Sequence, residues 1–87
     1  MDIIGIDCNK AIRQSEDLKT LARQLSNEII ELENFYLRLK NEWRGPASEE
    51  FQRKLLQLIE NMKTTRDILQ NTGYSVRGVA NYYQNQN

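Results

Sequence analysis

The chain contains a single proline, Pro46, which stands near the middle of its 87 residues and directly follows Gly45. Proline breaks a helix interior because it lacks an N–H and its ring collides with the preceding turn, but it suits the first helical position. Each side of Pro46 can therefore form one long helix, and Gly45 allows the backbone geometry of a reversal. We predict one domain over 1–87, with a first helix over about 8–43, a turn over 43–46, a second helix over about 46–83 and a frayed tail over 84–87.

Apolar residues recur every three or four positions in both halves, which is the period of a helix and not the two-residue period of a strand. In the first half the repeating positions are Leu18, Leu21, Leu25, Ile29, Leu32, Tyr36, Leu39 and Trp43. In the second half they are Ala47, Phe51, Leu55, Leu58, Met62, Thr65, Leu69, Thr72, Val76, Val79 and Tyr83. We expect an all-α fold, an antiparallel two-helix hairpin whose seam is formed by these two rows.

A hairpin of this size buries little surface. Two helices of about 50 Å leave much of each helix in water, so the gain from burial roughly balances the conformational entropy lost on folding. Further apolar residues flank the predicted seam, namely Ala22, Ile30, Leu37, Leu56, Ile59 and Ile68. A stripe this wide is typical of a helix buried on two sides of a bundle, although it could also only widen the contact inside the hairpin.

We therefore expect the hairpin to pair into a four-helix bundle. The residues predicted at the partner interface are Leu25, Ile29, Leu32, Tyr36, Leu39, Phe51, Leu55, Leu58, Ile59 and Met62.

Composition excludes several kinds of site. The chain has no histidine and one cysteine, which excludes a Ser-His-Asp or Cys-His catalytic unit, a His-based or Cys-rich metal site and an internal disulfide. Twelve basic and twelve acidic residues give a net charge of zero, which argues against nucleic acid as a partner. No apolar run reaches the roughly 18 residues of a membrane span, and the stretch from Met1 to Lys10 does not resemble a secretory signal peptide. We expect no enzymatic activity, no catalytic residue, no metal, no cofactor and no membrane insertion.

The residues around the turn carry a resemblance. Leu39, Trp43, Gly45, Ala47 and Phe51 form the pattern Leu-x3-Trp-x-Gly-x-Ala-x3-Phe between the two predicted helices. From about Asp7 to Tyr83 the chain resembles the WXG family, small helical hairpins exported by the bacterial type VII secretion system. The residues alone predict that the Trp43 ring closes the end of the bundle and that Gly45 permits the reversal. We take Trp43, Gly45 and Pro46 as the turn motif.

The resemblance implies a function and a set of partners. WXG proteins form antiparallel four-helix bundles as homodimers, with another helical-hairpin protein or with the N-terminal helical domain of a larger effector. The resemblance further implies that the turn faces the export machinery, with the secretion ATPase as an additional partner. Such proteins are cytoplasmic before export and leave the cell folded, without a cleaved signal peptide. We expect a non-enzymatic secreted substrate, or the small targeting partner of a larger effector.

One feature departs from the family pattern. The family's export signal is a tyrosine followed four residues later by Asp or Glu, just beyond the second helix. Here Tyr82 is followed at that spacing by Gln86, and Tyr83 by Asn87, so the two tyrosines form a degenerate signal. The residues alone predict that one tyrosine closes the seam and the other lies in solvent. In heterodimers of the family one partner can carry the signal for both chains, which favours a dedicated partner over a self-exporting homodimer. The alternative function is a cytosolic dimeric adaptor or scaffold that is not exported.

Overall fold

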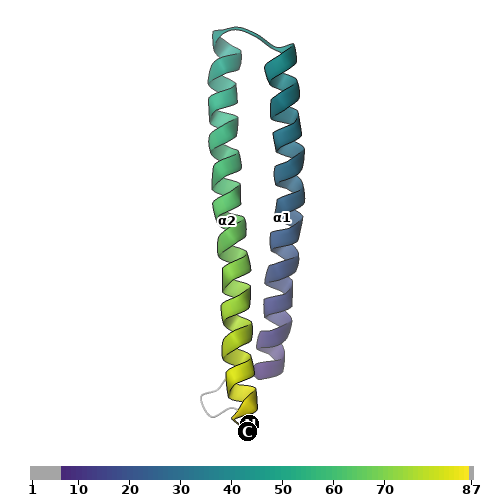
Figure 1. The fold of residues 1–87 in the computed structure, drawn as a ribbon, viewed down its shortest axis with the longest axis vertical. Helices are drawn as coiled ribbons and strands as arrows, with labels where there is room; N and C mark the ends of the chain where they lie inside the picture. The colour runs from purple at the N-terminus through teal and green to yellow at the C-terminus, as the bar shows by residue number, and fades with distance from the viewer. Residues whose placement is uncertain (1–6, 87) are drawn as a thin grey trace.

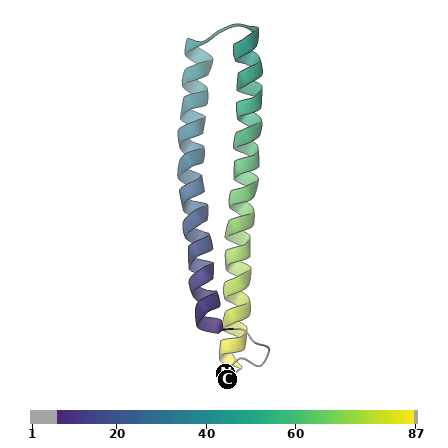
Figure 2. The same cartoon turned by 180° about the vertical axis from the view of Figure 1, so that it is seen from behind.

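The computed structural model describes residues 7–86, which form two helices, α1 (Cys8–Glu42) and α2 (Pro46–Asn85). The helices run antiparallel, joined by a short turn, and the start of α1 lies at the same end of the rod as the end of α2 (Figures 1 and 2). The molecule measures 64 × 16 × 13 Å. Its radius of gyration is 19.3 Å, against about 12 Å for a compact domain of this length. The prediction of an all-α helical hairpin is confirmed.

The helix ends follow local chemistry. Asp7 caps α1, because its side-chain Oδ1 accepts the backbone N–H of Lys10 at 3.0 Å. Helix α1 ends at Glu42, one residue before the predicted end, since Trp43 has an extended backbone with φ −122° and ψ 119°. Helix α2 continues to Asn85, two residues beyond its predicted end, and the fraying of the tail over 84–87 stays a prediction. Asn87 and residues 1–6 lie outside the described part of the chain, including most of the stretch judged for a signal peptide.

The turn depends on one glycine and one serine. Gly45 has φ +119°, a conformation that side-chain-bearing residues rarely adopt, although no atom would obstruct a Cβ there. Pro46 then occupies the first helical position, as expected. The buried Ser48 donates its hydroxyl to the Trp43 carbonyl at 2.6 Å and accepts the Gln52 side-chain amide at 2.9 Å. Ser48 therefore fastens the start of α2 to the end of α1, a role that the sequence did not reveal to us.

The seam between the helices repeats every seven residues. In α1 the buried residues are Ser15, Ala22 and Ile29, and in α2 they are Ser48, Leu55, Ile59, Gly73 and Ala80. Leu25, Leu32, Tyr36, Leu39 and Met62 pack against a core of Ile29, Leu55 and Ile59. A seven-residue spacing keeps the same face of each helix toward the other, as in coiled coils.

The predicted seam is wrong at several positions, each of which lies one place from the correct residue. Leu21 is 50% exposed while Ala22 is 5% exposed, and Leu58 is 48% exposed while Ile59 is 2% exposed. Val79 is likewise exposed and Ala80 is buried.

The reason is how closely the helices approach one another. A Cβ added to Gly73 would lie 3.2 Å from the Ser15 carbonyl oxygen, so the half of the seam away from the turn has room only for small side chains. Ser15, Ala22, Gly73 and Ala80 fill it, and larger residues such as Leu21 and Val79 are left on its flanks.

Candidate partner interface

The flanks of the seam differ from each other in charge. On one side of the hairpin, side chains from the two helices meet in polar contacts. These are Glu33 with Lys63 at 3.2 Å, Glu16 with Arg77, Lys19 with the Tyr74 ring at 4.9 Å from its centroid, and Gln84 with Asn9 at 3.4 Å. We call this side the ion-paired face.

Lys63 is the most connected charge on the ion-paired face. It contacts Glu33 across the seam at 3.2 Å and Glu60 on its own helix at 3.6 Å. The hydrogen bond and the negative charge of Glu33, with a smaller contribution from Glu60, raise the pKa of Lys63 above its ordinary value of 10.5. Lys63 and Glu33 are only partly buried, so their ion pair across the seam adds little to the stability of the fold.

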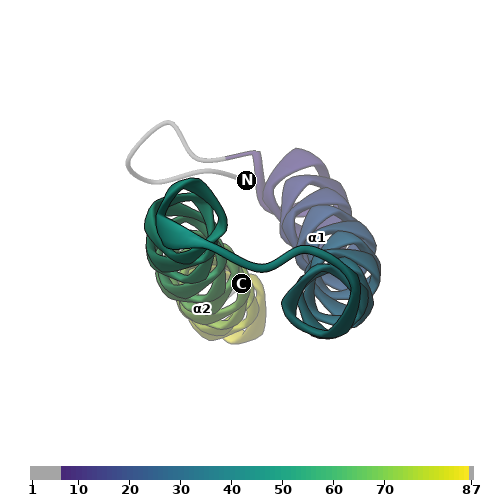
Figure 3. The same ribbon diagram turned by 90° about the horizontal axis from the view of Figure 1, so that it is seen from above.

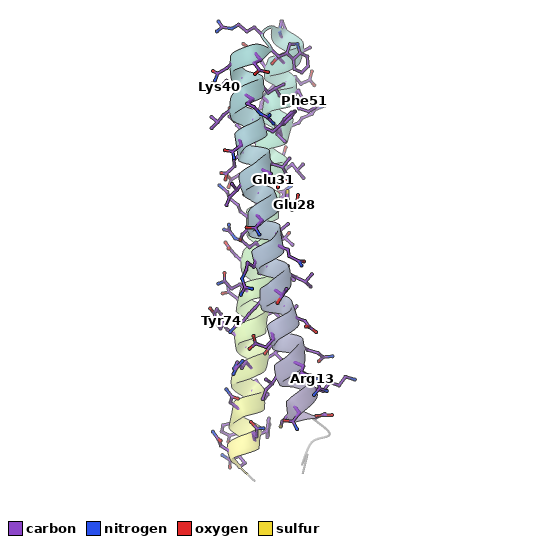
Figure 4. The ribbon with its side chains drawn as sticks, turned by 90° about the vertical axis from the view of Figure 1, so that its right-hand side faces the viewer. Arg13, Glu28, Glu31, Lys40, Phe51 and Tyr74 are labelled. Carbon is purple, nitrogen blue, oxygen red and sulfur yellow. The ribbon has the colours of Figure 1, made fainter. Side chains whose placement is uncertain are left out.

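The opposite side carries exposed apolar side chains from both helices. We call it the apolar face and define it by Leu21 and Phe35 of α1 and by Phe51, Leu58, Thr65, Thr72 and Val79 of α2. The five α2 residues are seven apart and form one uncharged row about 40 Å long. Figure 4 shows Phe51 and Tyr74 on opposite sides of the hairpin.

Helical geometry places the two rows of the apolar face on the same side. On α1, Leu21 and Phe35 lie on the flank away from Glu16 and Lys19, and on α2 the Phe51 row lies on the flank away from Arg77. Glu16 lies level with Arg77, and this antiparallel register sets Phe35 beside Leu58. The apolar face therefore spans both helices.

Half-buried residues form the floor of the apolar face. They form one row on each helix, between the exposed residues of the apolar face and the buried residues of the seam. These residues are Leu18, Leu25, Leu32 and Leu39 of α1 and Met62, Leu69, Val76 and Tyr83 of α2. A partner placed on this face would meet these leucines as well as the exposed residues. Viewed along the rod, each of the two helices formed by residues 8–85 has only the other helix as a neighbour, so no third helix of this described part covers the floor (Figure 3).

The residues predicted at the partner interface fall into three environments. Phe51 and Leu58 are exposed on the apolar face. Leu25, Leu32, Tyr36, Leu39 and Met62 are half-buried beside the core. Ile29, Leu55 and Ile59 are buried in the seam of the hairpin itself. Their contact with a partner stays a prediction. The exposed and the half-buried residues of this set are accessible to a partner, whereas the three buried residues are not.

A smaller apolar group lies on the ion-paired face. Ile30 and Leu37 are each 55% exposed, and Leu56, which lies level with Leu37, is 40% exposed. Lys63 lies beside this group and is engaged by Glu33, so charges interrupt the apolar surface there. Of the other flanking residues, Ile68 lies exposed beside the apolar face, and Ala22 and Ile59 are in the seam.

The amount of exposed surface is large for the mass of the chain. The accessible surface is 6506 Å² for 10.3 kDa, about 1,100 Å² above the roughly 5,400 Å² of a compact folded monomer of that mass. A standard protein–protein interface covers about 800 Å² on each partner. The hairpin therefore has enough surplus surface for one such interface.

At the turn, Trp43 is less buried than the sequence indicated. Its ring is 43% exposed and packs on Phe51, with centroids 6.1 Å apart and planes tilted by 52°. Within the hairpin the Trp43 ring covers Phe51 and leaves much of its own surface in solvent, and its closing of the end of a bundle stays a prediction. Together the two rings extend the apolar face to the turn.

Tyr82 and Tyr83, which we predicted to form a degenerate export signal, lie inside α2 and not beyond its end. Tyr83 is half-buried at the end of the seam and Tyr82 is exposed, the arrangement expected from the residues alone. Their rings meet edge to face at a centroid distance of 5.3 Å. Tyr82 is thus accessible from solvent, four residues before Gln86.

Residues 7–86 show no group of three or more histidine, cysteine, aspartate or glutamate side chains arranged to hold a metal ion. Neither of the two described helices is long and apolar enough to cross a membrane.

Comparison with known proteins identifies the family. The model of WXG100, proteins of 100 residues with WXG, matches residues 9–87. Neither the comparison with curated proteins nor the one with solved structures gave a match. WXG100 membership implies a small helical protein of type VII secretion, and proteins of the family are non-enzymatic and typically form helical-hairpin homo- or heterodimers. With its two-helix fold, its Trp43–Gly45 turn and a match over almost its whole length, the chain belongs to the WXG100 family.

Proposed function

We propose that this protein is a secreted hairpin of type VII secretion that pairs through its apolar face into a four-helix bundle, as substrate or as the small targeting partner of a larger effector. The observation that carries the proposal is the uncharged row from Phe51 to Val79, exposed beside a leucine floor. An uncharged row with three large exposed apolar side chains, bordered by half-buried leucines, is typical of a site of protein–protein contact.

Within such a pair, this chain is the member that depends on its partner for export. Tyr82 is exposed near the end of α2, but the residue four positions later is Gln86, which has no carboxylate. A partner hairpin or effector domain that carries the tyrosine and the acid would supply the signal for both chains. The Trp43 ring at the turn, which is 43% exposed, stays available for contact with the export machinery, including the secretion ATPase.

The test is co-expression with the product of the neighbouring gene, followed by size-exclusion chromatography with light scattering and by assay of the culture medium. We expect a stable complex of two hairpins, and both chains in the medium only when they are expressed together. Leu58→Ala should weaken the complex, whereas Leu37→Ala, which is on the ion-paired face and similarly exposed, should not.

Two outcomes would contradict parts of the proposal. A chain that stays monomeric alone and in the mixture would refute pairing. A dimer that never reaches the medium of a secretion-competent strain would refute export and favour the cytosolic adaptor. Gln86→Glu places a carboxylate four residues after Tyr82 and should allow export without the partner; continued retention of this variant would mean that the missing acid is not the reason for dependence.

A further inference from the structure

Two negative charges lie in the middle of the apolar face, whereas the nearest positive charge on that side of α1, Arg38, is engaged nearer the turn, over the Phe35 ring at 5.8 Å from its centroid. Glu28 lies in the same row as Leu21 and Phe35, and Glu31 lies on its outer side (Figure 4). The other charged residues at this height belong to the seam or the ion-paired face: Arg23, Glu33, Glu60, Lys63, Arg66 and Asp67. The corresponding stretch of α2 on the apolar face, from Leu58 to Thr72, is uncharged.

Neither carboxylate has a cation within reach along its own helix. Positions three and four residues from Glu28 and Glu31 hold Gln, Leu, Asn, Phe and each other, with no lysine or arginine. Glu28 and Glu31 are themselves three residues apart, a spacing at which like charges destabilise a helix. The ion-paired face, by contrast, matches Glu33 with Lys63 and Glu16 with Arg77. The free hairpin thus keeps an unfavourable pair of charges in the apolar face.

A second copy of this chain would not neutralise these charges. In one arrangement the second copy lies on the apolar face with its turn at the opposite end, so that the α1 helices of the two copies lie side by side. Glu28 is three residues, or about 4.5 Å, from the middle of α1, so the two Glu28 residues are then about 9 Å apart along the rod. If the turns lie at the same end, α1 lies on α2, and Glu28 meets the region of Thr65, which has no charge. In both arrangements the carboxylates are brought to the interface without a cation, which disfavours self-association.

We propose that the partner seated on the apolar face is a helical hairpin other than a second copy of this chain, and that it presents lysine or arginine side chains to Glu28 and Glu31. This inference rests on the proposed function and specifies its partner. Apolar contact along the Phe51–Val79 row supplies the affinity, and the two glutamates supply the selection against self.

Copies of this chain with added lysines serve as the probes. When the turns are opposed, residues of α1 whose numbers add to about 50 share a height, so Asp17→Lys/Gln24→Lys places cations level with the wild-type Glu31 and Glu28. Asn61→Lys/Thr65→Lys does so when the turns lie together. Labelled wild type is titrated with each unlabelled probe and with unlabelled wild type. As a control, Glu60→Lys/Asp67→Lys adds lysines on the ion-paired face, where both residues have contacts only within α2. Circular dichroism verifies that each variant keeps the helical content of the wild type.

We expect one of the two lysine probes to bind wild type about tenfold more tightly than wild type binds itself, the effect of two exposed ion pairs. The gain should disappear in about 1 M salt, where the screening length is about 3 Å. If neither probe binds more tightly than wild type, or if the control gives the same gain, the inference is overturned. The same titrations distinguish the proposed function from this inference. If wild type binds itself as tightly as it binds the probes, and Leu58→Ala weakens that binding, pairing through the apolar face stands and selection by charge is refuted.

Discussion

Leu58 and Ile59 are adjacent in the sequence and chemically similar, yet truncation of each should have a different effect. Ile59 lies in the core and is 2% exposed. Ile59→Ala removes about three buried carbons, whose burial stabilises the fold by about 0.8 kcal/mol each, and it also leaves a cavity. Because a core only two helices wide can partly collapse, we expect a loss near the low end for such changes, about 2–3 kcal/mol. Leu58 is 48% exposed, so Leu58→Ala should cost the dilute hairpin about 1 kcal/mol or less.

Urea unfolding followed by circular dichroism measures both losses in the free energy of unfolding. At low protein concentration the Ile59→Ala loss should be at least twice the Leu58→Ala loss. On raising the concentration, or on adding the partner, the Leu58→Ala loss should grow, because the wild type gains stability from association that the variant lacks. The Ile59→Ala loss should change much less. Equal losses at low concentration would place Leu58 in the seam and refute the assignment of the two faces.

Three further predictions use the same unfolding assay. Trp43→Ala should cost only about 1 kcal/mol in the isolated hairpin, since the ring is 43% exposed; a loss of about 3–5 kcal/mol would show that it is buried. Gly78→Ala should stabilise α2 by about 0.5–1 kcal/mol, because no atom lies near the added Cβ. Gly45→Ala should destabilise the turn by about 1–3 kcal/mol, because φ there is +119°. Effects of the opposite sign would contradict the helical position of Gly78 and the turn conformation of Gly45. Because the pKa of Lys63 is raised in the folded state, its ion pair contributes stability that is complete below the unfolded pKa of 10.5 and is lost as the pH rises through the folded pKa. In that pH range the wild type should lose more free energy of unfolding than Glu33→Gln. Equal losses in the two proteins would show that the Lys63–Glu33 pair does not contribute.

The fold was predictable because a few residues dictate it. One proline in the first helical position, a glycine before it and an unbroken three-to-four spacing leave no other regular arrangement for two such helices. The helix ends came within two residues of the prediction. Helix α2 continues through Gly73 and Gly78 to Asn85, two residues beyond its predicted end.

The face of each helix was harder to predict, because apolarity alone does not distinguish neighbouring residues. Leu21 is more apolar than Ala22, yet only the smaller side chain fits where the helices approach closely. The available signal was the seven-residue spacing of small residues, Ser15 with Ala22 and Gly73 with Ala80, which indicates close packing and not weakness. On α2 the predicted row was shifted to one flank, onto the surface that we now assign to the partner.

The register between the helices could not be obtained from the sequence. Glu16 and Arg77 are 61 residues apart, and only the folded hairpin shows that they meet and that the cross-helix ion pairs gather on one side. Without that register Glu28 and Glu31 are two surface charges among many. With it they lie in the middle of the apolar face.

The central claim is that a partner covers the apolar face and leaves the ion-paired face in solvent. Hydroxyl-radical footprinting of the co-purified complex and of the dilute hairpin, read by mass spectrometry, tests it directly. The exposed rings of Phe35 and Phe51 on one face and of Tyr74 on the other provide matched reporters. We predict that complex formation protects Phe35 and Phe51 and leaves the oxidation of Tyr74 unchanged. Protection of Tyr74 with undiminished oxidation of the two phenylalanines would contradict the account.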